Sequence, residues 1–431
     1  MTKLTCEKTL FLIIGILILP SLALADEPAE AQRAKADDFT LSGYTEVGKR
    51  STAEDYEEEG TDDDYAYQNY HLKLEQEVSD RLSYDISTFI YDKDYKTADS
   101  LDNISRIFKT NWSYYLKKLK EESLELDFKV KYREKRYKNS PRNEYDEIGA
   151  APSLTFKKKD LYTIDLALGI DNFDYLAEGQ KDQFKVFTRV AGKRYLLEKK
   201  LMLTGSYKLE NTEQEKIDRK RTKQEIAGGF DYIFELPWIY KLITRLDWGQ
   251  RDTKEEEERD EDFDYEYWRY YTKTEHRISS KLKTALKYQY FKKDYISSDL
   301  DHRGFYIRND WDYEVLDDEK QRIGFGLGLQ HKDVKYNLKS GNDYQKETVE
   351  VNLSYKRKKN WQTSAGLEQN FYDFDVKDND KKRTYVKLSA EKLFLEGDLV
   401  LSVDLKYRYT DYEQRDDKEQ EAVRLAFRYR F

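Results

Sequence analysis

Residues 124–133 read Leu-Glu-Leu-Asp-Phe-Lys-Val-Lys-Tyr-Arg, with an apolar or aromatic side chain at every even position and a charged one at every odd position. Residues 399–408, Leu-Val-Leu-Ser-Val-Asp-Leu-Lys-Tyr-Arg, repeat this period of two with one apolar exception. Successive side chains of a β-strand point to opposite faces, whereas a helix would scatter them around its circumference. The pattern therefore predicts strands with one apolar and one charged face.

Such units recur from Phe39 to the end of the chain, and the connections between them alternate in length. The short ones lie at 79–81, 157–160, 198–200, 235–238, 279–280, 316–319, 357–359 and 395–397. The longer ones include Ser51–Asp64, Asp92–Asn103, Asn211–Thr222, Asp252–Asp264, Asp333–Asp343 and Asp373–Lys381. Short periplasmic turns and longer extracellular loops are typical of outer-membrane barrels, which have an even strand number. We predict an all-β fold, a single closed antiparallel transmembrane β-barrel of about 20 strands (range about 18–22).

Two segments give the weakest strand pattern, Glu144–Phe156 and Asp182–Leu196. Pro152 falls inside the first. Proline cannot donate to a sheet ladder, and a closed barrel has no free edge where that would be tolerated. We therefore expect a β-bulge at Pro152.

The overall composition is polar for a membrane protein. The 431 residues are 37% charged and 38% hydrophobic, and the mean hydropathy is -0.96. Disorder is excluded because aromatic residues make up 15% of the chain. A bundle of membrane helices is excluded because the only uninterrupted apolar run is Leu10–Leu19. A barrel needs only alternate apolar residues and remains compatible with this composition.

The N-terminus has the parts of a secretory signal. Lys3 and Lys8 precede the apolar run, and Ala23-Leu24-Ala25 provides a small-residue cleavage site before Asp26. We expect a signal peptide at 1–25, a flexible periplasmic lead-in at 26–37 and the barrel at 38–431. A retained N-terminal anchor helix is the alternative, but the run is shorter than the ~20 residues of a membrane span.

Catalytic residue types are scarce. The single cysteine, Cys6, lies within the expected signal peptide, and the chain has only four histidines. We therefore predict no enzyme activity, no catalytic residue, no metal site and no cofactor. A barrel enzyme is the alternative, with His71 or His276 as its candidate base, and loss of lipid or peptide hydrolysis in an alanine variant of either residue would support it.

The last strand has Val423, Leu425, Phe427, Tyr429 and Phe431 at alternate positions. An aromatic C-terminal residue preceded by this alternation resembles the terminal strand of the Gram-negative outer-membrane β-barrel (porin-like) superfamily. The resemblance implies an outer-membrane location, contact with lipopolysaccharide, and recognition of Tyr429 and Phe431 by the barrel assembly machinery. It implies no particular substrate, and we expect no nucleic-acid partner.

Many tyrosines fall near predicted strand ends, and we expect them to form girdles at the membrane interface. They are Tyr44, Tyr67, Tyr91, Tyr132, Tyr162, Tyr207, Tyr240, Tyr265, Tyr313, Tyr355 and Tyr407. Sugar-stacking platforms inside a pore are the alternative. They would need aromatic side chains on the charged face, where Phe89, Tyr115, Phe187 and Tyr385 are examples.

The charged face of each strand is expected to line the lumen, where rings of charged side chains set the preference of a pore for ions. The basic candidates are Lys129, Lys131, Arg133, Arg245, Lys283, Lys287, Arg308, Lys406 and Arg408. The acidic candidates are Glu125, Asp127, Asp310, Asp312 and Asp404. Salt-bridge ladders that only stiffen the wall are the structural alternative.

The long loops are acidic. Ser51–Asp64 holds eight acidic residues and no basic one, and Asp252–Asp264 is similarly biased. Solvated loop tips explain this composition. Divalent-cation bridging at the lipopolysaccharide surface is the alternative, but the spacing does not match an EF-hand.

These features predict an outer-membrane channel for the passive passage of hydrophilic solutes, anionic solutes among them. A barrel of about 20 strands would be wide without a plug, so we expect infolded loops, long side chains or a partner protein to narrow it. The alternatives are a sheath filled by a partner, as in porin–cytochrome electron conduits, and export of an anionic polysaccharide. The Cys-x-x-Cys pair of some conduit barrels is absent.

Overall fold

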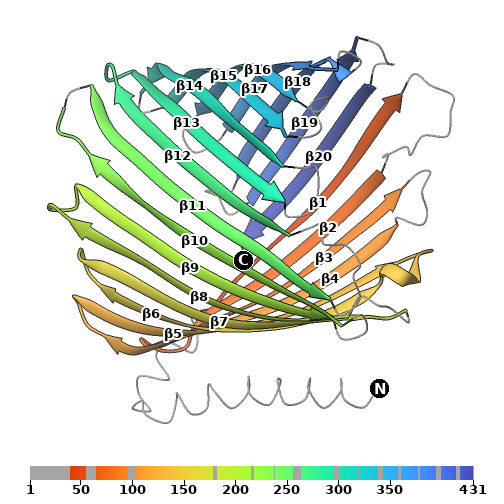
Figure 1. Ribbon diagram of the computed structural model, residues 1–431, viewed down its shortest axis with the longest axis vertical. Coiled ribbons are helices and arrows are strands. Elements are labelled where there is room, and N and C mark those ends of the chain that lie inside the picture. Colours follow the sequence, from red (N-terminus) through yellow and green to blue (C-terminus); the bar gives the residue numbers. More distant parts are fainter. Residues whose placement is uncertain are drawn as a thin grey trace.

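The computed structural model describes residues 39–54, 65–95, 102–177, 182–214, 218–236, 238–255, 264–295, 301–318, 320–337, 343–357, 361–376, 379–394, 399–413 and 418–430. These residues form one barrel of steeply tilted strands (Figure 1). The expected signal peptide and lead-in, and most of the two acidic loops, lie outside this part of the chain. No helix within it is long and apolar enough to cross a membrane.

The barrel wall is a 20-stranded sheet, which confirms the predicted fold class. Its strands are β1 (Phe39–Glu54), β2 (Tyr65–Glu77), β3 (Leu82–Tyr95), β4 (Asn103–Lys118), β5 (Glu122–Tyr137), β6 (Tyr145–Lys158), β7 (Tyr162–Tyr175), β8 (Gln183–Leu196), β9 (Leu201–Gln214), β10 (Arg219–Ile233), β11 (Ile239–Glu255), β12 (Tyr265–Arg277), β13 (Leu282–Tyr295), β14 (His302–Asp317), β15 (Gln321–Tyr336), β16 (Tyr344–Arg357), β17 (Trp361–Phe374), β18 (Lys381–Phe394), β19 (Leu399–Tyr412) and β20 (Lys418–Arg430).

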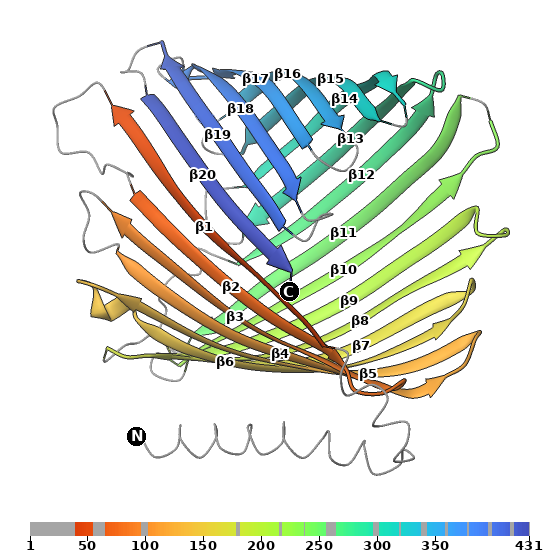
Figure 2. The same ribbon diagram turned by 180° about the vertical axis from the view of Figure 1, so that it is seen from behind.

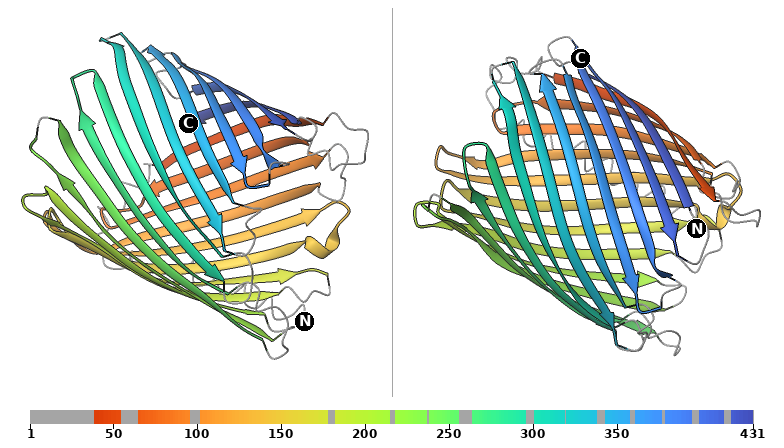
Figure 3. Two further views of the ribbon diagram at one scale, coloured as in Figure 1. Left: turned by 45° about the horizontal axis from the view of Figure 1, so that its top comes forward. Right: turned by 90° about the horizontal axis from the view of Figure 1, so that it is seen from above.

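Each strand pairs antiparallel with its neighbours in sequence, and β1 also pairs with β20. Gly43 lies opposite Tyr429 across this seam, so the sheet has no free edge (Figure 2). Closure gives the two end strands a partner on each side, and the interior of a membrane requires such pairing of the backbone. The view from above in Figure 3 shows the strands forming the wall.

The two faces of the wall are chemically distinct. On β5, Asp127 lies opposite Ser113 of β4 and Ser153 of β6, so the polar phase continues across neighbouring strands. The other phase presents large exposed apolar side chains, among them Leu72, Leu166, Leu168, Leu246, Leu286, Leu353, Leu367, Leu405 and Leu425. Because an apolar surface of this extent suits lipid and not water, it faces outward and the charged phase lines the lumen.

The strands are 13 to 17 residues long, longer than the ~9–11 residues that a span needs. The extra length shortens the connections between the strands. The expected long connection Asn211–Thr222 is therefore wrong, because β9 runs to Gln214 and β10 starts at Arg219. The first strand begins and the last strand ends on the short-turn side, as Ser42 opposite Arg430 shows.

The bulge expected at Pro152 is also wrong. On one side Pro152 stays in register opposite Phe128 of β5. On the other, the β6–β7 pairing stops after Ala150 opposite Ile170 and resumes with Ser153 opposite Ala167, without a shift in register. The missing N–H therefore interrupts the ladder locally and inserts no extra residue.

Acidic side chains close the hairpins on the long-loop side. The backbone N–H of Tyr95 donates to the carboxylate of Asp102 at 2.6 Å, and that of Tyr336 donates to Asp343 at 2.6 Å. Equivalent pairs join Tyr175 to Asp182, and Phe374 to Asp380. Each carboxylate satisfies the last N–H of a strand where the ladder ends.

Strands β2–β5 and β12–β15 share local details, although they are ten strands apart in the barrel. Both β4 and β14 carry a bulge near the short turn, between Tyr115 and Lys117 and between Glu314 and Leu316. In the short turn between β2 and β3, the Ser79 hydroxyl accepts a hydrogen bond from the N–H of Leu82 at 3.1 Å.

In the turn between β12 and β13, the Ser279 hydroxyl accepts a hydrogen bond from the N–H of Leu282 at 3.0 Å, as Ser79 does between β2 and β3. The sequence also repeats with an offset of 200 residues. Tyr65, Tyr67, Lys93 and Tyr95 have their counterparts in Tyr265, Tyr267, Lys293 and Tyr295. The two halves of the barrel therefore contain matching hairpins, β2–β3 and β12–β13.

Candidate functional site in the lumen

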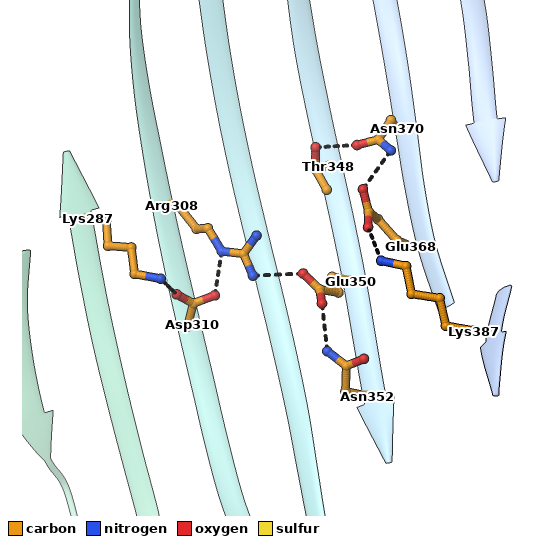
Figure 4. Close-up of polar contacts among 9 residues, drawn as sticks. All are labelled: Lys287, Arg308, Asp310, Thr348, Glu350, Asn352, Glu368, Asn370 and Lys387. Atoms are coloured by element: carbon orange, nitrogen blue, oxygen red, sulfur yellow. Dashed lines mark hydrogen bonds and ion pairs between the residues drawn. The ribbon is translucent and has the colours of Figure 1, made fainter. Parts of the chain in front are cut away.

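Ion pairs between neighbouring strands form a band along the lumen wall (Figure 4). Asp310 of β14 accepts from Lys287 of β13 at 2.7 Å and from Arg308 of its own strand at 2.6 Å. The Arg308 guanidinium also reaches Glu350 of β16 at 2.8 Å. One arginine thus connects two strands that are not adjacent.

A glycine makes this reach possible. Gly328 of β15 lies between Asp310 and Glu350 in the register, with its missing side chain toward the lumen. A Cβ at this position would lie 2.9 Å from a terminal nitrogen of Arg308. The guanidinium therefore crosses β15 through the space that this glycine leaves open.

A separate network lies beside it and extends to β18 (Figure 4). Lys387 donates to Glu368 at 3.1 Å, and the same carboxylate accepts from the side-chain amide of Asn370 at 2.9 Å. The carbonyl oxygen of Asn370 accepts from the Thr348 hydroxyl at 2.7 Å. Asn370 is only 1% exposed, so this network is fixed in place by buried polar contacts.

Similar pairs occur around the barrel. Asp231 of β10 accepts from Arg245 at 2.5 Å and from Lys241 at 3.0 Å, both on β11. Lys131 of β5 donates to Glu147 of β6 at 2.5 Å. Each pair is partly wetted and contributes about 0–1 kcal/mol to stability. Their main consequence is to hold many lumen charges in fixed positions.

All of the predicted lumen-charge residues lie on the inward face. Lys131, Arg245, Lys287, Arg308 and Asp310 belong to the ion pairs above. The others make these contacts: Lys283 pairs with Glu314, Glu125 with Lys157, and Asp404 with Arg424, while Asp127 accepts from Ser113 and Arg133 donates to Ser105. Lys129, Asp312, Lys406 and Arg408 form no ion pair with any residue in the described ranges.

A second group of lumen residues was missed by the sequence prediction. Four of the tyrosines expected at the membrane interface, Tyr44, Tyr67, Tyr91 and Tyr265, lie on the inward face, so that expectation is wrong for them. Tyr132, Tyr207 and Tyr313 do face outward and are exposed. Tyr65 and Tyr67 lie at odd positions of β2, as the inward Lys73 does, so the alternation along this strand would have identified them as inward residues.

The inward aromatic rings gather where the strands meet the long loops. On β2 and β3, the ring centres of Tyr65 and Tyr95 are 5.1 Å apart. On β16 and β17, those of Tyr344 and Phe374 are 5.3 Å apart. Other members of this aromatic band are Tyr145, Phe173, Tyr175, Tyr265, Tyr267, Phe291, Tyr295, His302, Tyr336 and Tyr372.

Cations in this band contact rings instead of carboxylates. Lys93 lies 4.0 Å from the centre of Tyr65, and Lys293 lies 3.9 Å from that of Tyr265. Lys346 and Arg383 both contact Tyr372, at 5.1 and 5.3 Å. Aromatic faces attract cations without neutralising their charge. Among the residues that the structure describes, the aromatic band therefore holds cations that no carboxylate neutralises.

The two histidines proposed as catalytic bases have ordinary neighbours. The His71 ring lies 5.0 Å from that of Tyr44 and 6.3 Å from that of Phe89, within the lumen. His276 faces outward, and its Nε2 is 3.0 Å from the Thr274 hydroxyl. In the described ranges no cluster of three or more His, Cys, Asp or Glu residues could hold a metal ion.

No protein-family model and no curated protein matches the chain. Solved structures do match. A mutant of the ferric enterobactin receptor PfeA from Pseudomonas aeruginosa has 9% identity, covers 90% of this chain and 80% of its own, and gives a TM-score of 0.53. OccK3 (OpdO) from the same species has 12% identity, covers 93% and 98%, and gives 0.45.

OccAB4 from Acinetobacter baumannii has 11% identity, covers 91% and 98%, and gives a TM-score of 0.48. Likeness at such identities shows the fold alone. The shared fold is a large closed β-barrel, and no specific family is shown for this chain.

Proposed function

We propose that this outer-membrane barrel is a channel that passes hydrophilic solutes passively. The observation that carries the proposal is the closed wall with an apolar exterior and a charged, hydrogen-bonded interior. In the described part of the chain, every residue belongs to the wall or to its turns, so none of these residues forms a plug. A polar lumen of this kind is the property of water-filled barrels.

We further propose that the channel prefers anions. Among the described residues at the loop end, inward cations outnumber inward carboxylates, and aromatic rings are the partners of many of these cations. Those without a carboxylate partner in the described ranges include Lys93, Arg133, Lys135, Lys293, Lys332, Lys346 and Arg383. Fixed charge in the wall selects mobile ions of opposite sign.

Conductance in planar bilayers tests both statements. The purified protein is expected to form ion-conducting pores, and its reversal potential in a potassium chloride gradient is expected to show chloride preference. Replacing Lys346 and Arg383 together by glutamate should lower the chloride-to-potassium permeability ratio by about twofold or more. Lys382→Glu is the matched control, because Lys382 is adjacent to Arg383 but faces outward. Absence of conductance would refute the channel itself.

A sheath filled by a partner protein is the second candidate. The observation in its favour is the width of the lumen. Barrel diameter grows with strand number, barrels of 22 strands carry a plug, and this barrel is nearly as large with 20 strands. Purification in mild detergent distinguishes the two candidates. A haem protein or lipoprotein bound in equal amounts would support the sheath, whereas a conducting barrel without one supports the channel. Export of an anionic polysaccharide is a variant of the channel that shares its preference for anions.

Export and assembly complete the proposal. Cleavage near Ala25/Asp26 would release the mature chain into the periplasm, and the barrel assembly machinery would read the terminal strand. Tyr429 has its place in the ladder opposite Gly43 and Leu399, while Phe431 lies outside the described residues. On the outward face, Arg106, Glu134, Arg136 and Asp146 form a charged network that could contact lipopolysaccharide.

A further inference from the structure

The matching hairpins β2–β3 and β12–β13 each carry the same group of inward residues at the loop end of the lumen. The β2–β3 cluster is Tyr65, Tyr67, Lys93 and Tyr95, and the β12–β13 cluster is Tyr265, Tyr267, Lys293 and Tyr295. We propose that these clusters are twin binding sites for carboxylated saccharides. The proposal rests on the channel function above and names the solute class that it would carry.

In the β2–β3 cluster a lysine lies among tyrosine rings. The Nζ of Lys93 is 4.0 Å from the centre of Tyr65 and 5.4 Å from that of Tyr95. It also donates to the Tyr95 hydroxyl at 3.2 Å. No carboxylate of the described residues forms an ion pair with Lys93, so its charge is free to act on a ligand.

The β12–β13 cluster repeats this geometry. The Nζ of Lys293 is 3.9 Å from the centre of Tyr265 and 4.5 Å from that of Tyr295. The guanidinium of Arg251, from β11, lies 4.7 Å from the Tyr265 ring and adds positive charge. Lys293 likewise has no ion pair with a carboxylate in the part of the chain that the structure describes.

Glycines on the adjacent strands shape both clusters. Gly48 of β1 lies opposite Tyr67, and Gly249 of β11 lies opposite Tyr267. A Cβ on either glycine would overlap the tyrosine ring, so each ring lies flat across the neighbouring strand. The tyrosines thus line the wall as flat surfaces and do not project across the lumen.

The repeat retains the whole cluster although other positions of the hairpins have changed, which argues for a shared role. Between the two hairpins, inward Ser87 corresponds to Lys287, and outward Leu72 corresponds to Thr272. The inward ion pair Lys73–Glu75 also recurs, as Lys273–Glu275, but these other positions differ while all four cluster residues are identical. A general need for a polar wall would not require the same residue types in the same places.

The chemistry of the clusters selects the ligand class. Each offers an ammonium group, phenolic hydroxyls and flat ring surfaces that are apolar on the face and polar at the tip. A carboxylated sugar presents a carboxylate for the ammonium, hydroxyls for the phenols and an apolar C–H face for a ring. A small inorganic anion would use only the ammonium, and a neutral sugar would leave it unpaired.

The topology places the clusters across the lumen from each other. Ten strands separate β2 from β12 in either direction around a closed barrel of 20 strands. Both clusters lie at the long-loop end, within a few residues of the strand termini. A saccharide entering or leaving by the loop side would therefore meet a site on each wall at the same depth.

Blockage of single-channel current tests the inference. Trigalacturonate should interrupt the current of the wild-type channel at concentrations where maltotriose, a neutral trisaccharide, does not. Replacing Lys93 and Lys293 together by methionine should weaken this blockage by about tenfold, because each substitution removes a charge-assisted contact. Each single variant should retain part of the effect, since the other cluster remains.

Lys292→Met is the matched control, because Lys292 is adjacent to Lys293 on β13 but faces outward, where it pairs with Asp294 at 2.5 Å. Trigalacturonate should block the Lys292→Met channel as strongly as it blocks the wild-type channel. Open-channel conductance of every variant confirms folding and insertion.

Conducting wild-type channels that trigalacturonate does not block would overturn the inference and leave the channel standing. Unchanged blockage in the double variant would also overturn it. Phosphate that blocks as strongly as trigalacturonate, and competes with it, would identify a simple anion site and refute the saccharide assignment. No conductance at all would refute the proposed function first.

Discussion

At the scale of single residues, the lumen network depends on where side chains are missing. Arg308 reaches Glu350 only because Gly328 leaves β15 open beneath it, and the rings of Tyr67 and Tyr267 lie flat over two other glycines. Glycine weakens a strand because it has no side chain to pack. Its use here is a close approach by a neighbouring side chain.

Gly328→Ala is expected to displace the Arg308 guanidinium and weaken its pair with Glu350, lowering the free energy of unfolding by about 0.5–1 kcal/mol. Urea titration of the protein in lipid vesicles measures this change. Gly326→Ala is the control, since a Cβ there would meet only ordinary contacts at 3.4 Å or more. Equal stability of the two variants would contradict the crossing geometry.

At the scale of elements, the seam between β1 and β20 closes the barrel, and one side chain fastens it on two sides. Arg424 of β20 reaches Glu46 of β1 at 2.6 Å and Asp404 of β19 at 3.7 Å. Glu46 is only 7% exposed. A carboxylate this buried is costly to leave unpaired.

Arg424→Met is expected to destabilise the barrel by about 1–2 kcal/mol, less than a fully buried pair because the arginine is partly wetted. The double variant with Glu46→Gln should recover much of this loss, because no unpaired charge is left. Unfolding of the wild type, both single variants and the double variant forms the cycle that measures it. Additive losses would show that the two residues do not interact.

The carboxylate caps of the long-loop hairpins belong to the same scale. In Asp343→Ala, the N–H of Tyr336 loses its acceptor at 2.6 Å, and its hydrogen exchange should accelerate by about tenfold or more. Exchange measured by mass spectrometry on the peptide that ends β15 detects this. Asp333→Ala, an outward substitution on the same strand, should leave the exchange of that peptide unchanged.

At the scale of the whole molecule, charge is graded along the lumen. Ion pairs of both signs occupy the middle, and cations held against aromatic rings occupy the loop end. The matching hairpins show that this grading occurs in both halves of the barrel. A solute passing through the lumen would meet an aromatic zone that holds unpaired cations, and a zone of fixed, mostly paired charge.

The proposed preference for anions should fall as salt rises. Screening shortens the reach of a wall charge from about 10 Å at 0.1 M to about 3 Å at 1 M ionic strength. Reversal potentials measured at the same gradient ratio but at low and high mean concentration give this dependence. A selectivity that does not change with salt would point to a narrow constriction in place of wall charge.

The sequence alone determined that the chain forms strands, about 20 of them, with two distinct faces, because the period of two and the turn spacing are local signals. It also placed Arg308, Asp310 and Lys131 on the lumen side. The interface assignment failed for four tyrosines, because a phenol ring suits both a lipid interface and a polar lumen, and only the phase of the charged residues on the same strand distinguishes the two. Only the tertiary structure decided which lumen charges meet. Arg308 and Glu350 lie on different strands, and the cross-strand register together with the gap at Gly328 brings them within 2.8 Å. Such contacts depend on which side chains lie opposite one another across several strands, and no local pattern encodes that.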